Sequence, residues 1–237
     1  MTLLARCCFG LLLLLAAGRT SPVAAEGPAH LFILSGQSNM AGLNPNASFT
    51  PAVQEKFGKD NVIVVKFAQG GQPIRRWYKQ WKSANATPSK NNGDLYDRLM
   101  QQVKQAIDGK QIATVTFVWM QGERDAKTKE VSVYGASLKG VVKQIEQDLG
   151  RDNLHVVVGK LGKGQLEGKP WSEDWAALRK VQEELCTSNP RWEIVDCDDL
   201  EMRGDNLHFT AEGYRGMGER FAKKAIALIE QSSGAAN

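Results

Sequence analysis

The chain has 237 residues, of which 42% are hydrophobic and 24% charged, and its net charge is +4. This composition excludes a disordered, collagen-like or coiled-coil protein, and so small a charge excess gives no reason to expect a nucleic-acid partner. The chain holds three histidines, His30, His155 and His208, so a polyhistidine metal centre is not expected and an imidazole-based mechanism has few candidates.

The first 25 residues have the layout of a secretory signal peptide. Arg6 precedes an apolar run over residues 9–17, and small residues follow up to Ala25, where we expect cleavage. The apolar run is shorter than the roughly 20 residues of a membrane-spanning helix, which favours a cleaved signal over a retained anchor. Cleavage removes two of the 30 basic residues, Arg6 and Arg19, and lowers the net charge from +4 to +2. We expect an exported protein, periplasmic or secreted, without stable membrane association.

Short apolar segments alternate with amphipathic segments along the rest of the chain. The apolar segments have the length and composition of buried strands, and they cover residues 30–35, 61–67, 112–119, 154–158 and 192–195. Apolar residues recur at helical spacing over residues 94–107, 133–149, 171–185 and 211–229. Strands that are continuously apolar predict a parallel sheet covered on both faces. We see no linker or repeat, and we expect one α/β domain over residues 26–237.

Ligands of such a sheet bind outside the carboxyl ends of the strands, so the residues that follow each strand are the candidate site. Ser38 follows the first strand on a tight turn that would present its hydroxyl above the sheet edge, although a serine there is more often a helix cap. Gly70 and Gly71 follow the second strand, and glycine lets a backbone N–H group approach a substrate closely. Gln121 and Glu123 follow the third strand and bring an amide and a carboxylate to the same edge.

Asp205 and His208 lie three residues apart, just ahead of the last predicted helix. An aspartate at this spacing can orient an imidazole, which removes the proton of a serine while the carboxylate stabilises the imidazolium. The pair is a weak signal alone, but with the motifs at the sheet edge it indicates nucleophilic catalysis by Ser38. His155 lies inside an apolar strand and is expected in the core, and His30 at the mature terminus is a poor base.

Cys186 and Cys197 are the two cysteines left after signal cleavage. An oxidising compartment permits a disulfide between them, and two buried free thiols that pack as small apolar residues are the alternative. Neither cysteine has a histidine or a basic cluster beside it in the sequence, so neither is expected to be a nucleophile.

Together these motifs resemble the SGNH hydrolase superfamily, and within it the branch of sialate O-acetylesterases and carbohydrate esterase family 6, which is acetylxylan esterase-like. The matching stretches extend across most of residues 30–229 and are residues 34–42, 70–74, 119–123 and 205–209. Their Gly-Gln-Ser-Asn and Gln-Gly-Glu blocks are specific to this branch. The resemblance implies a flavodoxin-like three-layer α/β/α sandwich around a five-stranded parallel sheet, and a serine esterase that needs no metal or cofactor.

The resemblance also implies roles for individual residues. Ser38 and Gly71 would donate backbone N–H groups to the oxyanion, with Gln121 in place of the asparagine of other SGNH enzymes. Gly70 is the alternative donor, because adjacent glycines leave the register open. The catalytic triad would be Ser38, Asp205 and His208, and the residues that support the site would be Gln37, Asn39, Gly70 and Glu123.

The implied reaction removes O-acetyl groups from a carbohydrate through an acetyl-Ser38 intermediate. The candidate substrates are acetylated xylan, another polysaccharide or oligosaccharide, and O-acetyl sialic acid. Arg75 and Trp77 are candidate substrate-binding residues, with ordinary solvation and packing as the alternatives. Met120 and Arg124 differ from the residues that the branch often has, which leaves substrate preference open.

Two other classes of function compete with the acetylesterase. A carbohydrate-binding protein on the same fold would lose part of the triad, whereas Ser38, Asp205 and His208 are all present. A broader short-chain lipase or thioesterase would need an apolar acyl groove, which the sequence does not reveal. The sequence does not indicate the oligomeric state.

Overall fold

A computed structural model describes residues 27–85 and 89–234 of the chain, and the signal peptide predicted over residues 1–25 lies outside them. Five strands form one sheet in the order β2-β1-β3-β4-β5, and every neighbouring pair is parallel. The strands are β1 (Ala29–Gly36), β2 (Val62–Ala68), β3 (Ile112–Met120), β4 (His155–Gly159) and β5 (Trp192–Val195). The strand order reverses around β1, so the ends of β1 and β3 form the switch point at which such sheets bind ligands.

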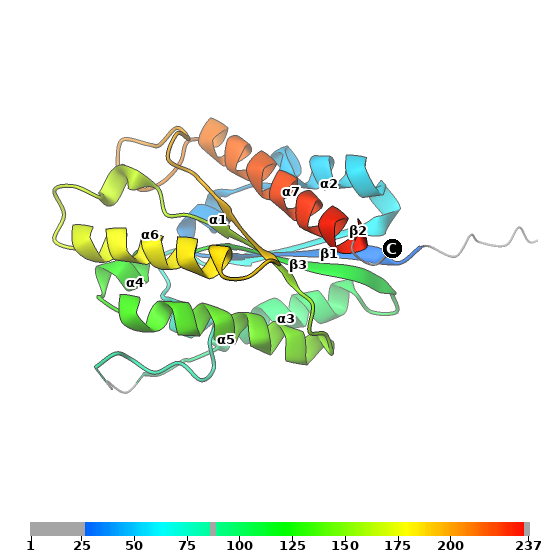
Figure 1. Cartoon of the computed structure of the whole chain (residues 1–237), viewed down its shortest axis with the longest axis horizontal. Helices are drawn as coiled ribbons and strands as arrows, with labels where there is room; N and C mark the ends of the chain where they lie inside the picture. Colours follow the sequence, from blue (N-terminus) through cyan, green and yellow to red (C-terminus); the bar gives the residue numbers. More distant parts are fainter. Residues whose placement is uncertain (1–26, 86–88, 235–237) are drawn as a thin grey trace, which may run out of the picture.

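Helices cover both faces of the sheet. The α-helices are α1 (Ser38–Gly42), α2 (Phe49–Phe57), α3 (Asp94–Ala106), α4 (Glu123–Lys127), α5 (Val131–Leu149), α6 (Ser172–Thr187) and α7 (Ala211–Gly234). Short 3₁₀ turns are η1 (Pro45–Ala47), η2 (Lys59–Asn61), η3 (Ile74–Arg76) and η4 (Lys163–Gln165). Figure 1 shows α3 and α5 on one face and α2 and α7 on the other, and α6 packs against α5 and β5. The expected three-layer α/β/α sandwich is confirmed.

The strands are apolar throughout because both faces of the sheet are covered. The last six residues of β1 and of β3 are buried, as are all five residues of β4. His155 begins β4 and is 3% exposed, as expected for a core histidine. The helix α2 was not predicted, because its nine residues bury only Phe49 and Val53 and so carry a weak apolar pattern. No helix in the described ranges combines the length and apolarity that a membrane crossing requires.

Cys186 at the end of α6 and Cys197 after β5 are free thiols, and both are buried. The disulfide alternative is therefore wrong, and the two cysteines pack as small apolar residues. Burial raises the pKa of each thiol to about 12, which leaves both protonated and poorly nucleophilic at neutral pH.

Gly36 fixes the distance between β1 and β3 at the switch point. Its φ is +147°, and a Cβ at this position would lie 2.0 Å from the carbonyl oxygen of Met120. The next residue, Gln37, donates its backbone N–H to that same oxygen over 3.0 Å. Only glycine allows this approach, which places the start of α1 directly beside the end of β3.

We predict that Gly36→Ala lowers the free energy of unfolding by about 3 kcal/mol or more, because the new methyl group meets backbone atoms that cannot move independently. Thermal or urea unfolding followed by circular dichroism measures the change. Gly204→Ala is the matched control, since a Cβ at Gly204 meets no atom within 4 Å. Equal stabilities for the two variants would contradict the close approach of β1 and β3.

Candidate active site

Ser38 is the first residue of α1, and its side chain does not cap the helix. The cap position belongs to Gln37, which makes no side-chain capping bond. The Ser38 hydroxyl instead lies 3.0 Å from Nε2 of His208, so the interpretation of Ser38 as a helix cap is wrong. Because β1 ends in the short turn at Gly36, this hydroxyl stands at the carboxyl edge of the sheet and is partly exposed.

His208 and Asp205 form the second half of this hydrogen-bonded relay. Nδ1 of His208 lies 2.7 Å from one carboxylate oxygen of Asp205, and the other oxygen accepts the backbone N–H groups of Leu207 and His208, both over 2.9 Å. These bonds, led by the one from the His208 backbone, lower the pKa of Asp205 to about 2. The ionised carboxylate only accepts, so Nδ1 carries the proton and Nε2 turns a lone pair toward Ser38.

Residues 202–209, which we name the base loop, hold this pair in place. The N–H of Arg203 donates to the carbonyl of His208 over 2.7 Å, and the N–H of Asn206 donates back to Arg203 over 2.9 Å. The Gln165 amide donates to the carbonyl of Asn206 over 3.0 Å, and a Cβ at Gly164 would lie 2.3 Å from that oxygen. The glycine-rich segment after β4 thus packs directly under the base loop.

Asn39 joins the nucleophile to the base loop. Its side-chain N–H₂ donates to the carboxylate of Glu123 over 2.9 Å and to the carbonyl of Leu207 over 3.1 Å, and its side-chain oxygen accepts the hydroxyl of Tyr214 over 3.1 Å. Asn39 is 2% exposed, so water does not compete for these bonds. We call this set the Asn39 clamp. Tyr214 was not identified from the sequence, where it reads only as an apolar position of the last helix.

Two glycine carbonyls are engaged beside Ser38 while their N–H groups stay free. The carbonyl of Gly70 accepts the amide of Gln72 over 3.1 Å, and the carbonyl of Gly71 accepts Nε of Arg124 over 2.9 Å. Over residues 27–85 and 89–234, no acceptor takes the backbone N–H of Ser38, Gly70 or Gly71. All three residues line one pocket, so each N–H group is available to an anion at Ser38.

Gln121 does not reach that pocket, which corrects the predicted oxyanion role of its side chain. The residue is fully buried, and its N–H₂ group donates to the carboxylate of Asp125 over 2.5 Å and to the carbonyl of Gln72 over 3.1 Å. Asp125 also accepts the N–H of Ile74 over 2.9 Å. The pair therefore braces the loop after β2, and Asp125 had no role assigned from the sequence.

Trp77 is also placed away from the substrate side. It is fully buried, and its indole N–H donates to the hydroxyl of Ser35 over 3.0 Å, so the packing alternative is right and the predicted substrate contact is wrong.

Arg75 is partly exposed and lines a pocket. The supporting residues Gln37 and Glu123 lie in the wall of the pocket that holds Ser38, and the carbonyl oxygen of the Gln37 side chain accepts the backbone N–H of Arg124 over 3.2 Å.

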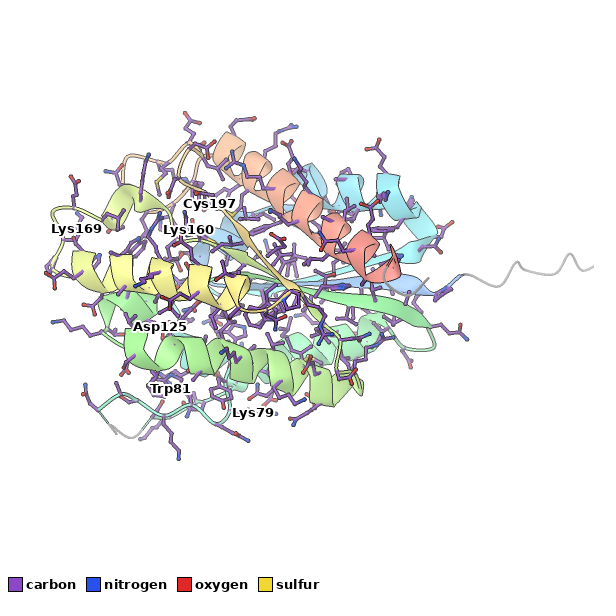
Figure 2. All side chains as sticks on the ribbon, viewed as in Figure 1. Lys79, Trp81, Asp125, Lys160, Lys169 and Cys197 are labelled. Carbon is purple, nitrogen blue, oxygen red and sulfur yellow. The ribbon has the colours of Figure 1, made fainter. Side chains whose placement is uncertain are left out.

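Two pockets of about 380 Å³ each lie side by side at this edge. The site pocket is lined by Gln37, Ser38, Gly70, Gly71, Glu123, Arg124, Lys127, Leu207 and His208. The second pocket is lined by Gly71, Gln72, Pro73, Arg75, Trp81, Arg124, Asp125, Thr128 and Glu130. Figure 2 shows Asp125 and Lys169 at the end of the molecule where α4 begins. In the described part of the chain, no three His, Cys, Asp or Glu side chains gather as metal ligands would.

Two carboxyl groups of α4, those of Glu123 and Asp125, are buried. Glu123 is 2% exposed and Asp125 is fully buried, and loss of hydration raises the pKa of each carboxyl to about 7. One oxygen of Glu123 holds the Asn39 amide, and the other has no hydrogen-bond partner among the described residues. Burial therefore raises the pKa of Glu123 and Asp125 well above that of Asp205, which stays ionised at neutral pH.

Comparison with known proteins places the chain among carbohydrate esterases. A family model described as "Carbohydrate esterase, sialic acid-specific acetylesterase" matches residues 41–227. A probable carbohydrate esterase of Arabidopsis thaliana is 25% identical over 209 residues, which cover 86% of this chain and 70% of that protein. The solved structure of that Arabidopsis protein superposes with a TM-score of 0.67 at 21% identity, over 85% of this chain and 99% of that one.

Two further solved structures share the fold. A carbohydrate acetylesterase from Xanthomonas citri matches with a TM-score of 0.61 at 17% identity, over 84% of this chain and 56% of that one. A member of the lipolytic G-D-S-L family from Veillonella parvula matches with a TM-score of 0.52 at 10% identity, over 84% of this chain and 97% of that one. These likenesses confirm the SGNH-type fold that the sequence motifs predicted.

We predict that Glu123→Gln flattens the pH dependence of stability. The folded-state pKa of Glu123 lies above its ordinary value of 4.5, so the folded state binds this proton more tightly and the free energy of unfolding falls as the pH rises from about 4.5 to about 7. The variant removes up to about 3 kcal/mol of that fall while an amide oxygen can still accept from Asn39.

Urea unfolding at a series of pH values measures the effect. Asp125 remains in both proteins, so the difference between the two curves reports the titration of Glu123 together with its charge repulsion with Asp125. Glu219→Gln on the exposed face of α7 is the control, and its curve should run parallel to that of the unmodified protein. A parallel curve for Glu123→Gln would show that this carboxyl is not held in a desolvated state.

Proposed function

Because the chain belongs to the family of sialic acid-specific carbohydrate acetylesterases, which are carboxylic ester hydrolases, we propose that it removes O-acetyl groups from a carbohydrate through an acetyl-Ser38 intermediate. The observation that carries the proposal is the unbroken relay from the Ser38 hydroxyl through His208 to Asp205, with contacts of 3.0 and 2.7 Å. Hydrogen-bonded nucleophile, base and orienting carboxylate are the three parts that serine hydrolysis requires.

In the first step the Ser38 oxygen attacks the acetyl carbonyl while Nε2 of His208 takes the hydroxyl proton. The carbonyl oxygen becomes an oxyanion, which the N–H of Ser38 and the N–H of Gly71 or Gly70 stabilise. One well-placed donor of this kind contributes about 3 kcal/mol to the transition state. The imidazolium then gives its proton to the sugar oxygen as the carbon–oxygen bond of the ester breaks, which releases the sugar alcohol and leaves acetyl-Ser38.

In the second step water replaces the sugar. His208 removes a proton from the water as it attacks acetyl-Ser38, the same N–H groups hold the second oxyanion, and the imidazolium returns its proton to the Ser38 oxygen. Acetate leaves and the free hydroxyl is restored. Asp205 stabilises the imidazolium in both steps by accepting from Nδ1, without taking the proton itself.

The types of side chain that line the site pocket support an acetyl rather than a long acyl group. Among the described residues that line it, Leu207 is the one apolar side chain, and the others are polar, charged or glycine. A lipase needs an apolar surface along which a long chain loses its contact with water. Acetylated xylan, other acetylated polysaccharides or oligosaccharides, and O-acetyl sialic acid all present an acetyl group on a polar sugar, and the family description favours the last of these.

We predict that Ser38→Ala lowers kcat for p-nitrophenyl acetate by at least about 10⁴-fold, because no other group replaces the nucleophile. Release of p-nitrophenol measures the loss, and the melting temperature of the variant should stay close to that of the unmodified protein. Ser132→Ala, at an exposed serine of α5 that lines neither pocket, is the control and should retain activity. A Ser38→Ala protein with substantial turnover would eliminate the acetyl-Ser38 mechanism, and a non-catalytic binding protein would show no turnover in either form.

We also predict that kcat/KM falls by at least about tenfold from the acetyl to the octanoyl p-nitrophenyl ester, since Leu207 is the one apolar side chain that lines the site pocket among the described residues and the added methylene groups gain little by contact with it. The same release of p-nitrophenol gives both values. Equal or rising values along the series would favour a broader lipase or thioesterase over the acetylesterase.

A further inference from the structure

The second pocket adjoins the catalytic one, and Arg124 stands at the boundary between them. Arg124 and Gly71 line both pockets. Met120 and Arg124 are the two positions at which this chain differs from the residues that its branch often has. Met120 is fully buried, whereas Arg124 is exposed. Of these two departures, only Arg124 is therefore able to contact a substrate.

The Arg124 side chain is anchored but not neutralised. Its Nε donates to the carbonyl of Gly71 over 2.9 Å, and its backbone N–H donates to the side chain of Gln37 over 3.2 Å. No carboxylate in residues 27–85 or 89–234 forms an ion pair with it. A guanidinium has five N–H donors, so one bond from Nε leaves the terminal nitrogens available while the side chain is held in position.

The acidic side chains around the second pocket are already engaged. Both oxygens of Glu130 accept bonds, one from the hydroxyl of Ser83 over 2.7 Å and one from the N–H of Ala84 over 3.0 Å. The buried Asp125 is held by Gln121 and Ile74. These two carboxylates therefore accept from the protein's own donors and do not pair with Arg124.

Further positive charge surrounds this boundary. Arg75 lines the second pocket and Lys127 lines the site pocket. Desolvation lowers the pKa of Lys127 most, and charge repulsion from Arg124 and Lys169 adds to the lowering, while the charges of Glu123 and Asp205 oppose it. Cations that repel one another at the mouth of a site gain free energy when an anion binds between them.

We propose that the second pocket is a subsite for an acidic sugar, whose carboxylate pairs with the terminal nitrogens of Arg124. The inference rests on the proposed function, since it places the carboxylate next to an acetyl ester held at Ser38. A guanidinium fork matches a carboxylate with two parallel hydrogen bonds, which gives directional selectivity that a lysine does not. Trp81 and Pro73 line the same pocket and offer apolar surface for the face of a sugar ring.

The required chemistry is a carboxylate on, or beside, the acetylated sugar ring. A sialic acid carries it on the acetylated ring, and a uronic acid carries it on a neighbouring ring of a polysaccharide. The two sources are distinguished by the substrate arms of the test. Neutral acetylated xylan lacks the group and should be the poorer substrate.

The test compares substrates that differ only in this charge. Acetate release is measured from O-acetyl-N-acetylneuraminic acid and from its carboxamide, and from an acetylated xylo-oligosaccharide with a glucuronic acid branch and from its glucuronamide counterpart. We expect kcat/KM for the acid to exceed that for its neutral counterpart by at least about tenfold in one of the two pairs, as charge-assisted hydrogen bonds would produce. High salt should reduce this preference.

The variants assign the preference to Arg124. Arg124→Gln should bring the acid-to-neutral ratio close to one, and Arg124→Lys should restore part of it, because the charge remains but the fork is lost. Arg98→Gln, the same change at an exposed arginine on α3 that lines neither pocket, should keep the ratio of the unmodified protein. Melting temperatures show whether each variant is folded.

The outcomes separate the two proposals. If the unmodified protein cleaves p-nitrophenyl acetate but shows a ratio near one in both pairs, or if Arg124→Gln keeps the ratio, the acidic subsite is overturned and the esterase stands. If the protein cleaves none of the acetyl esters, both proposals fall. A preference confined to one pair supports the subsite and identifies the source of the carboxylate.

Discussion

The contact between Ser38 and His208 depends on the buried side-chain amide of Asn39. Ser38 and His208 are 170 positions apart in the chain and must meet within 3.0 Å. The Asn39 amide donates to the carbonyl of Leu207, so the residue after the nucleophile is tied to the residue before the base. Glu123 and Tyr214 fix the amide from α4 and α7. Asn39 is 2% exposed, so its side-chain amide is largely shielded from water, which strengthens the hydrogen bonds that it makes.

The sheet brings together the elements that carry the Asn39 clamp. The strand order reverses at β1, and Gly36 allows β1 and β3 to approach more closely than any other residue would. This brings α1 and α4 to the same point at the sheet edge, with Ser38 on the first and Glu123 and Arg124 on the second. The buried carboxyl groups of Glu123 and Asp125 have a pKa of about 7, while Asp205 keeps a pKa of about 2. Their environments thus give Glu123 and Asp125 a different charge from Asp205 near neutral pH. Asp205, which accepts from the imidazole of His208, is the carboxylate that stays ionised.

The fold and the relay were predictable because short patterns in the sequence identify them. Apolar runs locate all five strands to within a residue or two, and the turn after β1 and the Asp205–His208 spacing identify the relay. The hydrogen bonds that support the site from Tyr214, Gln121 and Trp77 have no such pattern in the sequence. Tyr214 reads as a core residue of a helix, Gln121 was expected in the pocket but is held by Asp125, and Trp77 was expected near the substrate but packs under β1. Each of these outcomes depends on which partner captures a polar group in the folded protein, a near one for Gln121 and a distant one for Trp77 and Tyr214, and the sequence does not specify that choice. Export rests on residues 1–25 alone and stays a prediction.

The central claim is that Ser38 carries the acetyl group during turnover. Acid quenching during the hydrolysis of an excess of an acetyl ester, followed by peptide mass spectrometry, tests this directly. The account predicts one acetyl group on the peptide that contains Ser38, assigned to that serine by fragmentation and lost when turnover is allowed to finish. Turnover of the unmodified protein with no acetyl group on Ser38 at any quench time, or an acetyl group on another residue, would contradict it.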